Sequence, residues 1–215
     1  MTSNYMRFIT VPFALITVAA QSAVAPSAVA QSGHIGVIGG ATFSTLNGLK
    51  SVDQRTGAMG GLSLVLPLGG SVSLQPEALF VTKGAKGTVS SSSTGVSIKY
   101  AEVPVLLRFS SSKASIVVPH VYVGPYFGLQ IDCTVQGSSG SCDDLPGVST
   151  KSVDLGGIAG GGIDLNVGGL VLTAGARYDF GVSKVIEFKT SSVREAAKNG
   201  AFALYAGLSV GFGKK

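Results

Sequence analysis

Tryptophan is absent from this sequence, histidine occurs only twice, and Asp, Glu, Lys and Arg together make up only 13% of the residues. The net charge is only +5 and the basic residues are dispersed along the chain. A nucleic-acid-binding protein normally concentrates its basic residues on one face or along one helix. We therefore expect no nucleic-acid partner.

Long hydrophobic runs are also missing from residues 31–215. A membrane-spanning helix needs about 18 or more consecutive apolar residues, and no segment of this region approaches that length. Yet 45% of all residues are hydrophobic, and the mean hydropathy is high for a soluble protein. High hydropathy without a spanning helix favours a membrane β-barrel.

The N-terminus has the three parts of a secretory signal peptide. Arg7 gives a positive start, Phe8–Ala20 is an apolar segment too short to span a membrane, and Ala28–Ala30 is a small-residue cleavage site. We therefore predict a signal peptide at 1–30 and one β-barrel domain at 31–215.

The cysteine count excludes a disulfide-rich scaffold. Cys133 and Cys142 are the only cysteines and lie in a Gly/Ser-rich stretch. In an exported chain such a pair indicates a local disulfide, with two free thiols as the alternative. The bond would stabilise the fold by roughly 2.5–3 kcal/mol in the chain-entropy description.

What the sequence does contain is a repeated alternation of apolar and polar residues. In Lys99–Phe109, for example, Val103, Val105 and Leu107 share one face, and Glu102 and Arg108 share the other. A soluble sandwich would bury the apolar face, whereas a membrane barrel turns it toward lipid. Eight segments are long enough to cross a membrane as tilted strands. They are His34–Leu46, Gly57–Leu66, Ser71–Lys83, Lys99–Phe109, Ile116–Cys133, Ser152–Leu165, Leu170–Phe180 and Ala201–Phe212.

The connections between these segments alternate in length. The long ones are Leu46–Thr56, Gly84–Gly95, Thr134–Lys151 and Val185–Gly200, and the short ones are Pro67–Gly70, Ser110–Ala114 and Asn166–Gly169. Outer-membrane barrels have short periplasmic turns and longer extracellular loops. The sequence therefore predicts an all-β, eight-stranded antiparallel transmembrane β-barrel, an up-and-down meander in the bacterial outer membrane with both termini periplasmic.

The inward face of this predicted barrel is rich in glycine and carries a few charges. An eight-stranded barrel has an interior just wide enough to be filled by side chains. We expect a structural charge network in the lumen, in which Arg177 neutralises Glu77 and Glu102 and closes the interior. Its expected members are Glu77, Glu102, Arg108, Arg177 and Asp179.

Three prolines fall inside the predicted strands: Pro76, Pro104 and Pro125. Proline cannot donate a hydrogen bond to a neighbouring strand, and an unmet carbonyl is costly in lipid. We expect β-bulges or lumen-facing water at these positions.

Four stretches in this order resemble the PorT-like outer-membrane β-barrel family, which is related to the small OmpA/OmpX-type barrels. They are Tyr100–Leu107, Val123–Gly128, Ala176–Asp179 and Ala206–Phe212. The resemblance covers most of the chain after residue 30. It implies location and architecture, but it implies little about activity because fold does not specify function.

The last predicted strand also looks like the signal read by the barrel-assembly machinery. Tyr205, Gly207, Val210 and Phe212 fit the pattern polar, glycine, apolar, aromatic, although Gly213–Lys215 follow the aromatic residue. The resemblance therefore implies that the assembly machinery is a partner during biogenesis. Outer-membrane lipid and lipopolysaccharide are the other expected partners, and we expect a monomer.

Catalysis finds little support in the sequence. His34 and His120 both fall near the predicted periplasmic end, away from the outer rim where lipid or peptide chemistry is expected. Asp143 and Asp144 could hold a cation, but a solvated acidic loop tip is the stronger interpretation of this pair. We expect no catalytic residue, no metal and no cofactor.

The predicted function is therefore a structural or interaction role, with a small pore for passive solutes as the alternative and a lipid-modifying enzyme as a weaker one. Basic residues in or beside the long loops could contact lipopolysaccharide phosphates, or they could form an ordinary solvated surface. They are Lys50, Arg55, Lys83, Lys86, Lys151, Lys184, Lys189, Arg194 and Lys198.

Overall fold

The computed structural model describes residues 33–47, 53–89, 92–111, 115–136, 148–150, 152–183, 186–190 and 193–213. The regular structure in these ranges is β-strand throughout. The strands are β1 Gly33–Asn47, β2 Asp53–Gly69, β3 Val72–Val89, β4 Ser92–Ser110, β5 Val117–Gln136, β6 Val148–Thr150, β7 Val153–Val167, β8 Leu170–Gly181, β9 Ile186–Thr190 and β10 Val193–Phe212. Within the described ranges, no helix is both long enough and apolar enough to cross a membrane.

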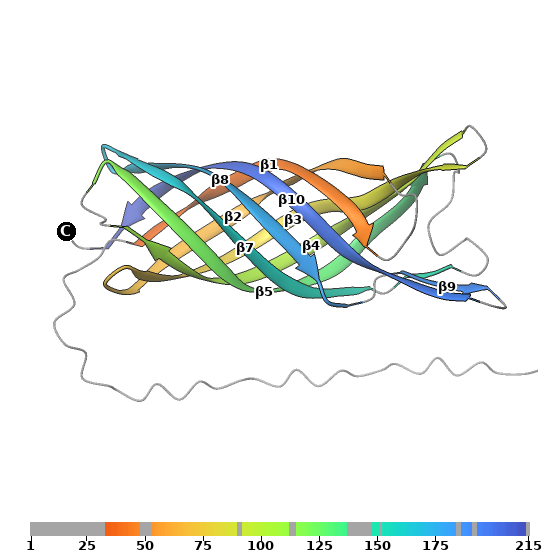
Figure 1. Cartoon of the computed structure of the whole chain (residues 1–215). Helices are drawn as coiled ribbons and strands as arrows, with labels where there is room; N and C mark the ends of the chain where they lie inside the picture. Colours follow the sequence, from red (N-terminus) through yellow and green to blue (C-terminus); the bar gives the residue numbers. More distant parts are fainter. Residues whose placement is uncertain are drawn as a thin grey trace, which may run out of the picture.

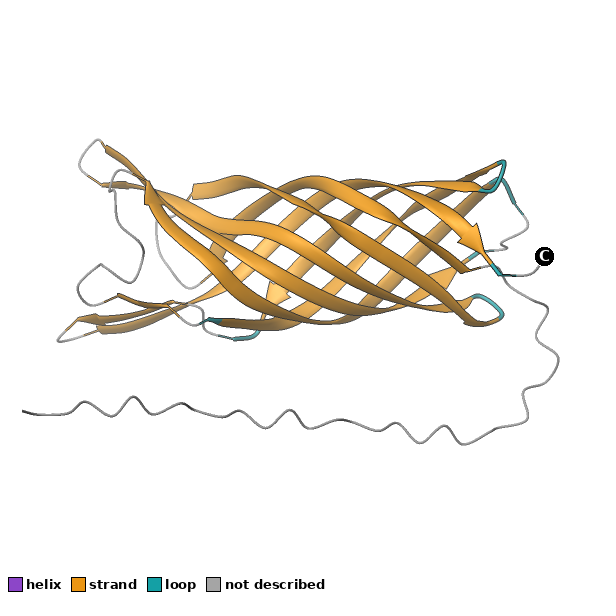
Figure 2. Cartoon of the chain, turned by 180° about the vertical axis from the view of Figure 1, so that it is seen from behind, coloured by secondary structure: helices purple, strands orange, loops and turns teal. Residues whose placement is uncertain are grey.

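Eight long strands form a closed barrel (Figures 1 and 2). Its wall follows the order β1-β2-β3-β4-β5-β7-β8-β10, and β10 pairs with β1 to close it. All of these pairings are antiparallel. The predicted eight-stranded antiparallel meander is confirmed.

The two ends of the barrel differ. The start of β1 and the end of β10 lie at one end with the tight connections β2–β3 and β7–β8, and we call this the turn end (Figure 1). The opposite end, called the loop end, carries an extension in which the first residues of β10 pair with β9 and β9 pairs with β6. The alternation of apolar and polar residues predicts neither of these short strands.

All four of the long connections expected at the loop end are wrong in extent, the first because β2 already begins at Asp53. β3 and β4 continue to Val89 and Ser92, and β10 begins at Val193 rather than near residue 201. β6 lies inside another expected loop. The cause is that these parts of the strands lack the apolar alternation on which the prediction depended.

The faces of the wall agree with a membrane barrel. Outward side chains such as Phe80 and Val121 are 67% and 60% exposed, whereas the inward Tyr100 is fully buried. Lys99 and Asp132 form an exposed ion pair of 2.8 Å on the outer surface, on the loop-end side of the apolar residues of β4. Apolar residues therefore cover the outside, as predicted, whereas the inside holds the buried charged groups together with an apolar cluster that includes Ile38, Leu106 and Ile158.

The prolines do not produce the expected bulges. Pairing stops for two residues beside Pro76 on β3–β4 and beside Pro104 on β4–β5, and it then resumes in the same register. The register shift in β4–β5 lies instead between Lys99 and Tyr100. Interrupted pairing, rather than an inserted residue, accommodates these prolines.

Candidate functional site in the barrel lumen

The lumen is filled by side chains from all eight wall strands, and glycines make room for the largest of them. Tyr126 lies opposite Gly156, and Tyr122 lies opposite Gly160. A Cβ atom on Gly156 would be 2.5 Å from the Tyr126 ring, and one on Gly160 would be 2.7 Å from the Tyr122 hydroxyl. The backbone of β8 is at least as close, since the first Cβ atom would overlap the Phe180 carbonyl oxygen and the second would lie 2.7 Å from the Ala176 carbonyl oxygen. Glycine at these positions therefore lets both the tyrosine rings and the adjacent strand pack closely.

The polar groups of the lumen form three connected clusters. The first, near the turn end, is centred on Arg108 of β4. Its Nη2 contacts the Asp164 carboxylate of β7, and its Nη1 donates to Gln75 Oε1 at 3.1 Å. Thr173 donates to the other oxygen of Asp164 at 2.8 Å, and His120 Nδ1 lies 3.6 Å from that oxygen. Arg108 therefore ties three strands of the wall together.

The second cluster lies next to the first and is centred on Arg177 of β8. Arg177 Nη1 donates to Glu77 Oε2 at 2.9 Å, and Gln75 Nε2 donates to Glu77 Oε1 at 2.7 Å. Arg177 Nε is also 3.2 Å from Asp179 Oδ1. Gln75 thus connects Arg108 to Glu77, and the two arginine clusters are continuous.

The third cluster, toward the loop end, is centred on Lys83 of β3. Its Nζ lies 2.6 Å from Glu102 Oε1 and 3.7 Å from Asp179 Oδ2. The same ammonium group lies 4.3 Å from the centre of the Tyr126 ring, a cation–π distance. Lys83 is completely buried, so the expectation that it belongs with the basic residues of the loops is wrong.

Asp154 closes the third cluster on the side of β7. Its Oδ2 accepts hydrogen bonds from Tyr126 at 3.0 Å and Asn199 at 2.8 Å, and its Oδ1 accepts one from Ser183 at 3.0 Å. Lys83 Nζ is 3.8 Å from Asp154 Oδ2. The carboxylate is therefore held by β3, β5, β10 and Ser183, which lies just beyond the end of β8.

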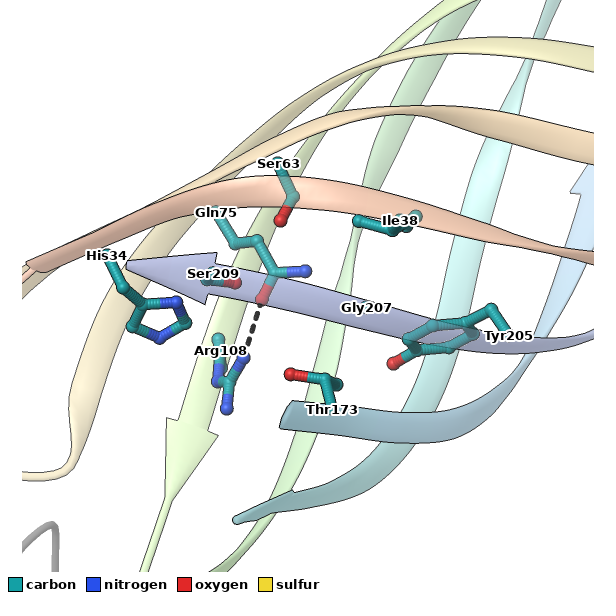
Figure 3. Close-up of a pocket in the computed structure, with 9 residues that line it drawn as sticks. All are labelled: His34, Ile38, Ser63, Gln75, Arg108, Thr173, Tyr205, Gly207 and Ser209. Atoms are coloured by element: carbon teal, nitrogen blue, oxygen red, sulfur yellow. Dashed lines mark hydrogen bonds between the residues drawn. The ribbon is translucent and has the colours of Figure 1, made fainter. Parts of the chain in front are cut away.

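A small cavity remains beside Arg108 (Figure 3). Its volume is about 10 Å³, room for about one water molecule. Hydroxyl, amide and guanidinium groups face it, and Arg108 and Gln75 are joined across it by their hydrogen bond. Its lining is His34, Ile38, Ser63, Gln75, Arg108, Thr173, Tyr205, Gly207 and Ser209.

The five residues predicted for the lumen all lie buried inside it: Glu77, Glu102, Arg108, Arg177 and Asp179. The predicted ion pair of Arg177 with Glu77 is present. Glu102, however, pairs with Lys83, and the second carboxylate beside Arg177 is that of Asp179. The residues that the predicted network missed are Lys83, Asp154 and Asp164. A sequence signal existed for Lys83, since it follows Glu77 at an even spacing on one strand and so shares its inward face.

The other predicted sites lie at two places. Tyr205 and Gly207 of β10 face the lumen, and Val210 and Phe212 face outward with 51% and 41% of their surface exposed. Cys133 is buried in β5, whereas Cys142 lies outside the described residues, so their disulfide stays a prediction.

Two further expectations concern metals and loops. Within the ranges that the structure describes, no group of three or more His, Cys, Asp or Glu could hold a metal ion. Asp143 and Asp144 lie outside those ranges. So do Lys50, Lys151 and Lys184 among the basic residues of the loops.

Known proteins share this architecture. Neisserial surface protein A superimposes with a TM-score of 0.54 at 15% identity, over 85% of this chain and 99% of that one. OprG from Pseudomonas aeruginosa gives 0.52 at 14% identity, over 86% and 98%. Outer membrane protein W of E. coli gives 0.50 at 12% identity, over 85% and 99%. At these identities the likeness is one of fold alone.

No curated protein sequence matches this chain. A family model does: the outer membrane protein β-barrel domain matches residues 20–187. Together with the closed eight-stranded wall and its apolar outer face, this match establishes that the chain belongs to the outer membrane protein β-barrel domain family.

Proposed function

We propose that this protein is a non-conducting outer-membrane scaffold, whose lumen is closed by its own side chains and whose role is structural or interaction-level rather than enzymatic. The observation that carries the proposal is the continuous polar network from Asp164 through Arg108, Gln75, Glu77 and Arg177 to the Lys83 cluster. It crosses the interior from wall to wall, so a solute can pass only if buried ion pairs separate.

Opening such a path is energetically unfavourable. Separating one partner from a buried ion pair typically costs about 3–5 kcal/mol, because the remaining charge stays buried and uncompensated. A path through this lumen would have to separate ion pairs in more than one cluster. The cavity beside Arg108, at about 10 Å³, is far smaller than a solute path requires.

The finer assignments belong to the same proposal. The four sequence stretches support a PorT-like barrel, and the tight turns beside both termini support a periplasmic turn end. The pattern Tyr205, Gly207, Val210 and Phe212 supports recognition by the barrel-assembly machinery. Basic residues at the loop end support contact with lipopolysaccharide phosphates outside the cell, by a monomeric barrel.

A planar-bilayer recording tests the closed lumen. Purified, heat-modifiable barrel should insert without producing discrete current steps, while a known porin added to the same bilayer conducts. Unitary current steps that scale with the amount of barrel would overturn the proposal in favour of a small pore. Swelling of proteoliposomes in a small sugar gives a second readout of the same point.

A further inference from the structure

The contact between β1 and β10 differs from every other contact in the wall. All other neighbouring wall strands follow one another along the chain, with at most one short strand between them. A connection of limited length constrains the register of the strands it joins. β1 and β10 come from opposite ends of the chain, so their register, which runs unbroken from Gly33–Phe212 to Asn47–Lys198, needs another determinant.

Size complementarity is present at six successive lumen-facing pairs of this seam, and it ends at the loop end, where Leu46 pairs with Asn199. In each pair one member is glycine or alanine, while the other is usually larger. From the turn end the pairs are His34–Gly211, Gly36–Ser209, Ile38–Gly207, Gly40–Tyr205, Thr42–Ala203 and Ser44–Ala201.

The two lumen-facing glycines of β1 fit their partners closely. A Cβ atom on Gly40 would overlap the Leu204 carbonyl oxygen and would lie 2.8 Å from Tyr205 Cα. A Cβ atom on Gly36 would overlap the Leu208 carbonyl oxygen in the same way. Gly39, which faces outward between them, has 3.7 Å of clearance to its nearest neighbour. Around the middle of β1 the close fit is therefore on the lumen face.

The alternative registers lose this complementarity. A slip of one residue would turn the apolar face of β10 inward, so the realistic alternatives are slips of two. One such slip puts Ile38 opposite Tyr205 and Gly36 opposite Gly207. The other puts Thr42 opposite Tyr205 and Gly40 opposite Gly207. Each slip places a branched side chain opposite the tyrosine, which crowds that position. Each slip also leaves two glycines opposite each other, which creates a void.

We propose that this matching of glycine on β1 with side chains on β10, above all Gly40 with Tyr205, sets the register in which the barrel closes. Phe212 supports the same register at the turn end, since its ring covers Gly33, where a Cβ atom would be 2.6 Å from Phe212 Cζ. Tyr205 and Phe212 thereby act inside the finished wall, in addition to any role as an assembly signal.

Cysteine pairs across the seam report its register directly. Val37 and Leu208 are outward partners, so Val37→Cys with Leu208→Cys reports the native register. Val37→Cys with Ala206→Cys, or with Val210→Cys, reports the two slipped registers. In barrels isolated from membranes and oxidised, cross-links mapped by peptide mass spectrometry should form only in the first pair.

Gly40→Ala should move a measurable share of cross-linking into a slipped pair. Gly175→Ala is the matched control: its Cβ atom would press on the same tyrosine, 2.5 Å from the Tyr205 hydroxyl, but from β8, whose register is constrained by its connection. It should lower stability and leave the cross-links native. If Gly40→Ala fails to assemble, Tyr205→Ala adds no bulk and should still give slipped cross-links. Native cross-links alone in Tyr205→Ala, or in a Gly40→Ala barrel that assembles, would overturn the proposal.

Discussion

Lys83 and Glu102 face each other across β3 and β4, with Nζ and Oε1 2.6 Å apart and both side chains fully shielded from solvent. The pair lies within a lumen whose walls are surrounded by apolar surface. A charge in such a place depends on its partner, because no solvent reaches it to compensate for the loss.

Replacing Lys83 should therefore destabilise the barrel strongly. Lys83→Met leaves Glu102 and Asp179 without their nearest shared cation, and we expect a loss of about 3–5 kcal/mol. The free energy of unfolding can be measured by urea titration of the barrel in lipid vesicles, with the folded fraction read from its gel mobility. The double variant Lys83→Met with Glu102→Gln should recover much of the loss, since it removes both charges.

Lys99→Met is the surface control for this experiment. Lys99 forms an ion pair of the same type with Asp132, but both side chains are about half exposed. Its loss should cost about 0–1 kcal/mol. Equal effects of Lys83→Met and Lys99→Met would contradict a buried, low-dielectric lumen.

Arg177→Ala should lower the unfolding temperature of the detergent-solubilised barrel clearly. The change leaves Glu77 and Asp179 without their guanidinium, a loss of about 3–5 kcal/mol by the same reasoning. Arg177→Lys keeps the charge but cannot bond both carboxylates through one planar group, so its melt should fall between those of Arg177→Ala and wild type. An unchanged melt for Arg177→Ala would show that solvent already reaches this cluster.

Glycines that face tyrosine rings should not tolerate a methyl group. Gly156→Ala would place its Cβ atom 2.5 Å from the Tyr126 ring, and overpacking of this kind typically costs about 1–3 kcal/mol. Gly60→Ala, on the outer face with 3.7 Å of clearance, should be nearly neutral. The urea midpoint of unfolding should be clearly lower for Gly156→Ala than for Gly60→Ala, and similar midpoints for the two variants would contradict the expectation.

The predicted disulfide can be tested by counting the reactive thiols of the purified protein. Unfolded without reductant, the chain should present no reactive thiol, and after reduction it should present two. Cys142→Ser should expose one thiol, that of Cys133, before reduction. Two reactive thiols in the unreduced wild type would show that the bond is absent.

The orientation can be read in intact cells with a membrane-impermeant thiol reagent. In a background lacking both native cysteines, Ser92→Cys, at the start of β4 at the loop end, should react at once. Ser71→Cys, in the tight connection of the turn end, should react only after the outer membrane is permeabilised. The reverse pattern would place both termini outside.

The wall of the barrel could be predicted from the sequence because every strand that crosses the membrane must alternate in polarity. Outward positions such as Val103 and Val105 must suit lipid, and inward ones such as Glu102 must suit a crowded polar lumen. The extension could not be predicted in this way. Beyond the membrane both faces meet water, so the segment of β10 that starts at Val193 has no reason to alternate.

The sequence predicts which charged residues face the lumen, but it does not predict which of them form ion pairs with one another. Glu77 and Glu102 were identified by their inward parity, yet Glu102 lies opposite Leu79 rather than level with Glu77. Which cation reaches which carboxylate depends on this register, on strand tilt and on side-chain length. The alternation of inward and outward positions predicts none of these three. The sequence pattern ends this strand at Lys83 and so groups Lys83 with the basic residues beside the loops, whereas β3 continues to Val89.

β10 belongs to two structures at once. Its first residues pair with β9 in the loop-end extension, and the rest of the strand forms both the wall contact with β8 and the closing seam with β1. The extension is thus joined to the wall by one continuous strand. A force applied to the extension would therefore pass along β10 to Tyr205 and the seam, so the part of the protein outside the membrane and the closure of the barrel are mechanically coupled.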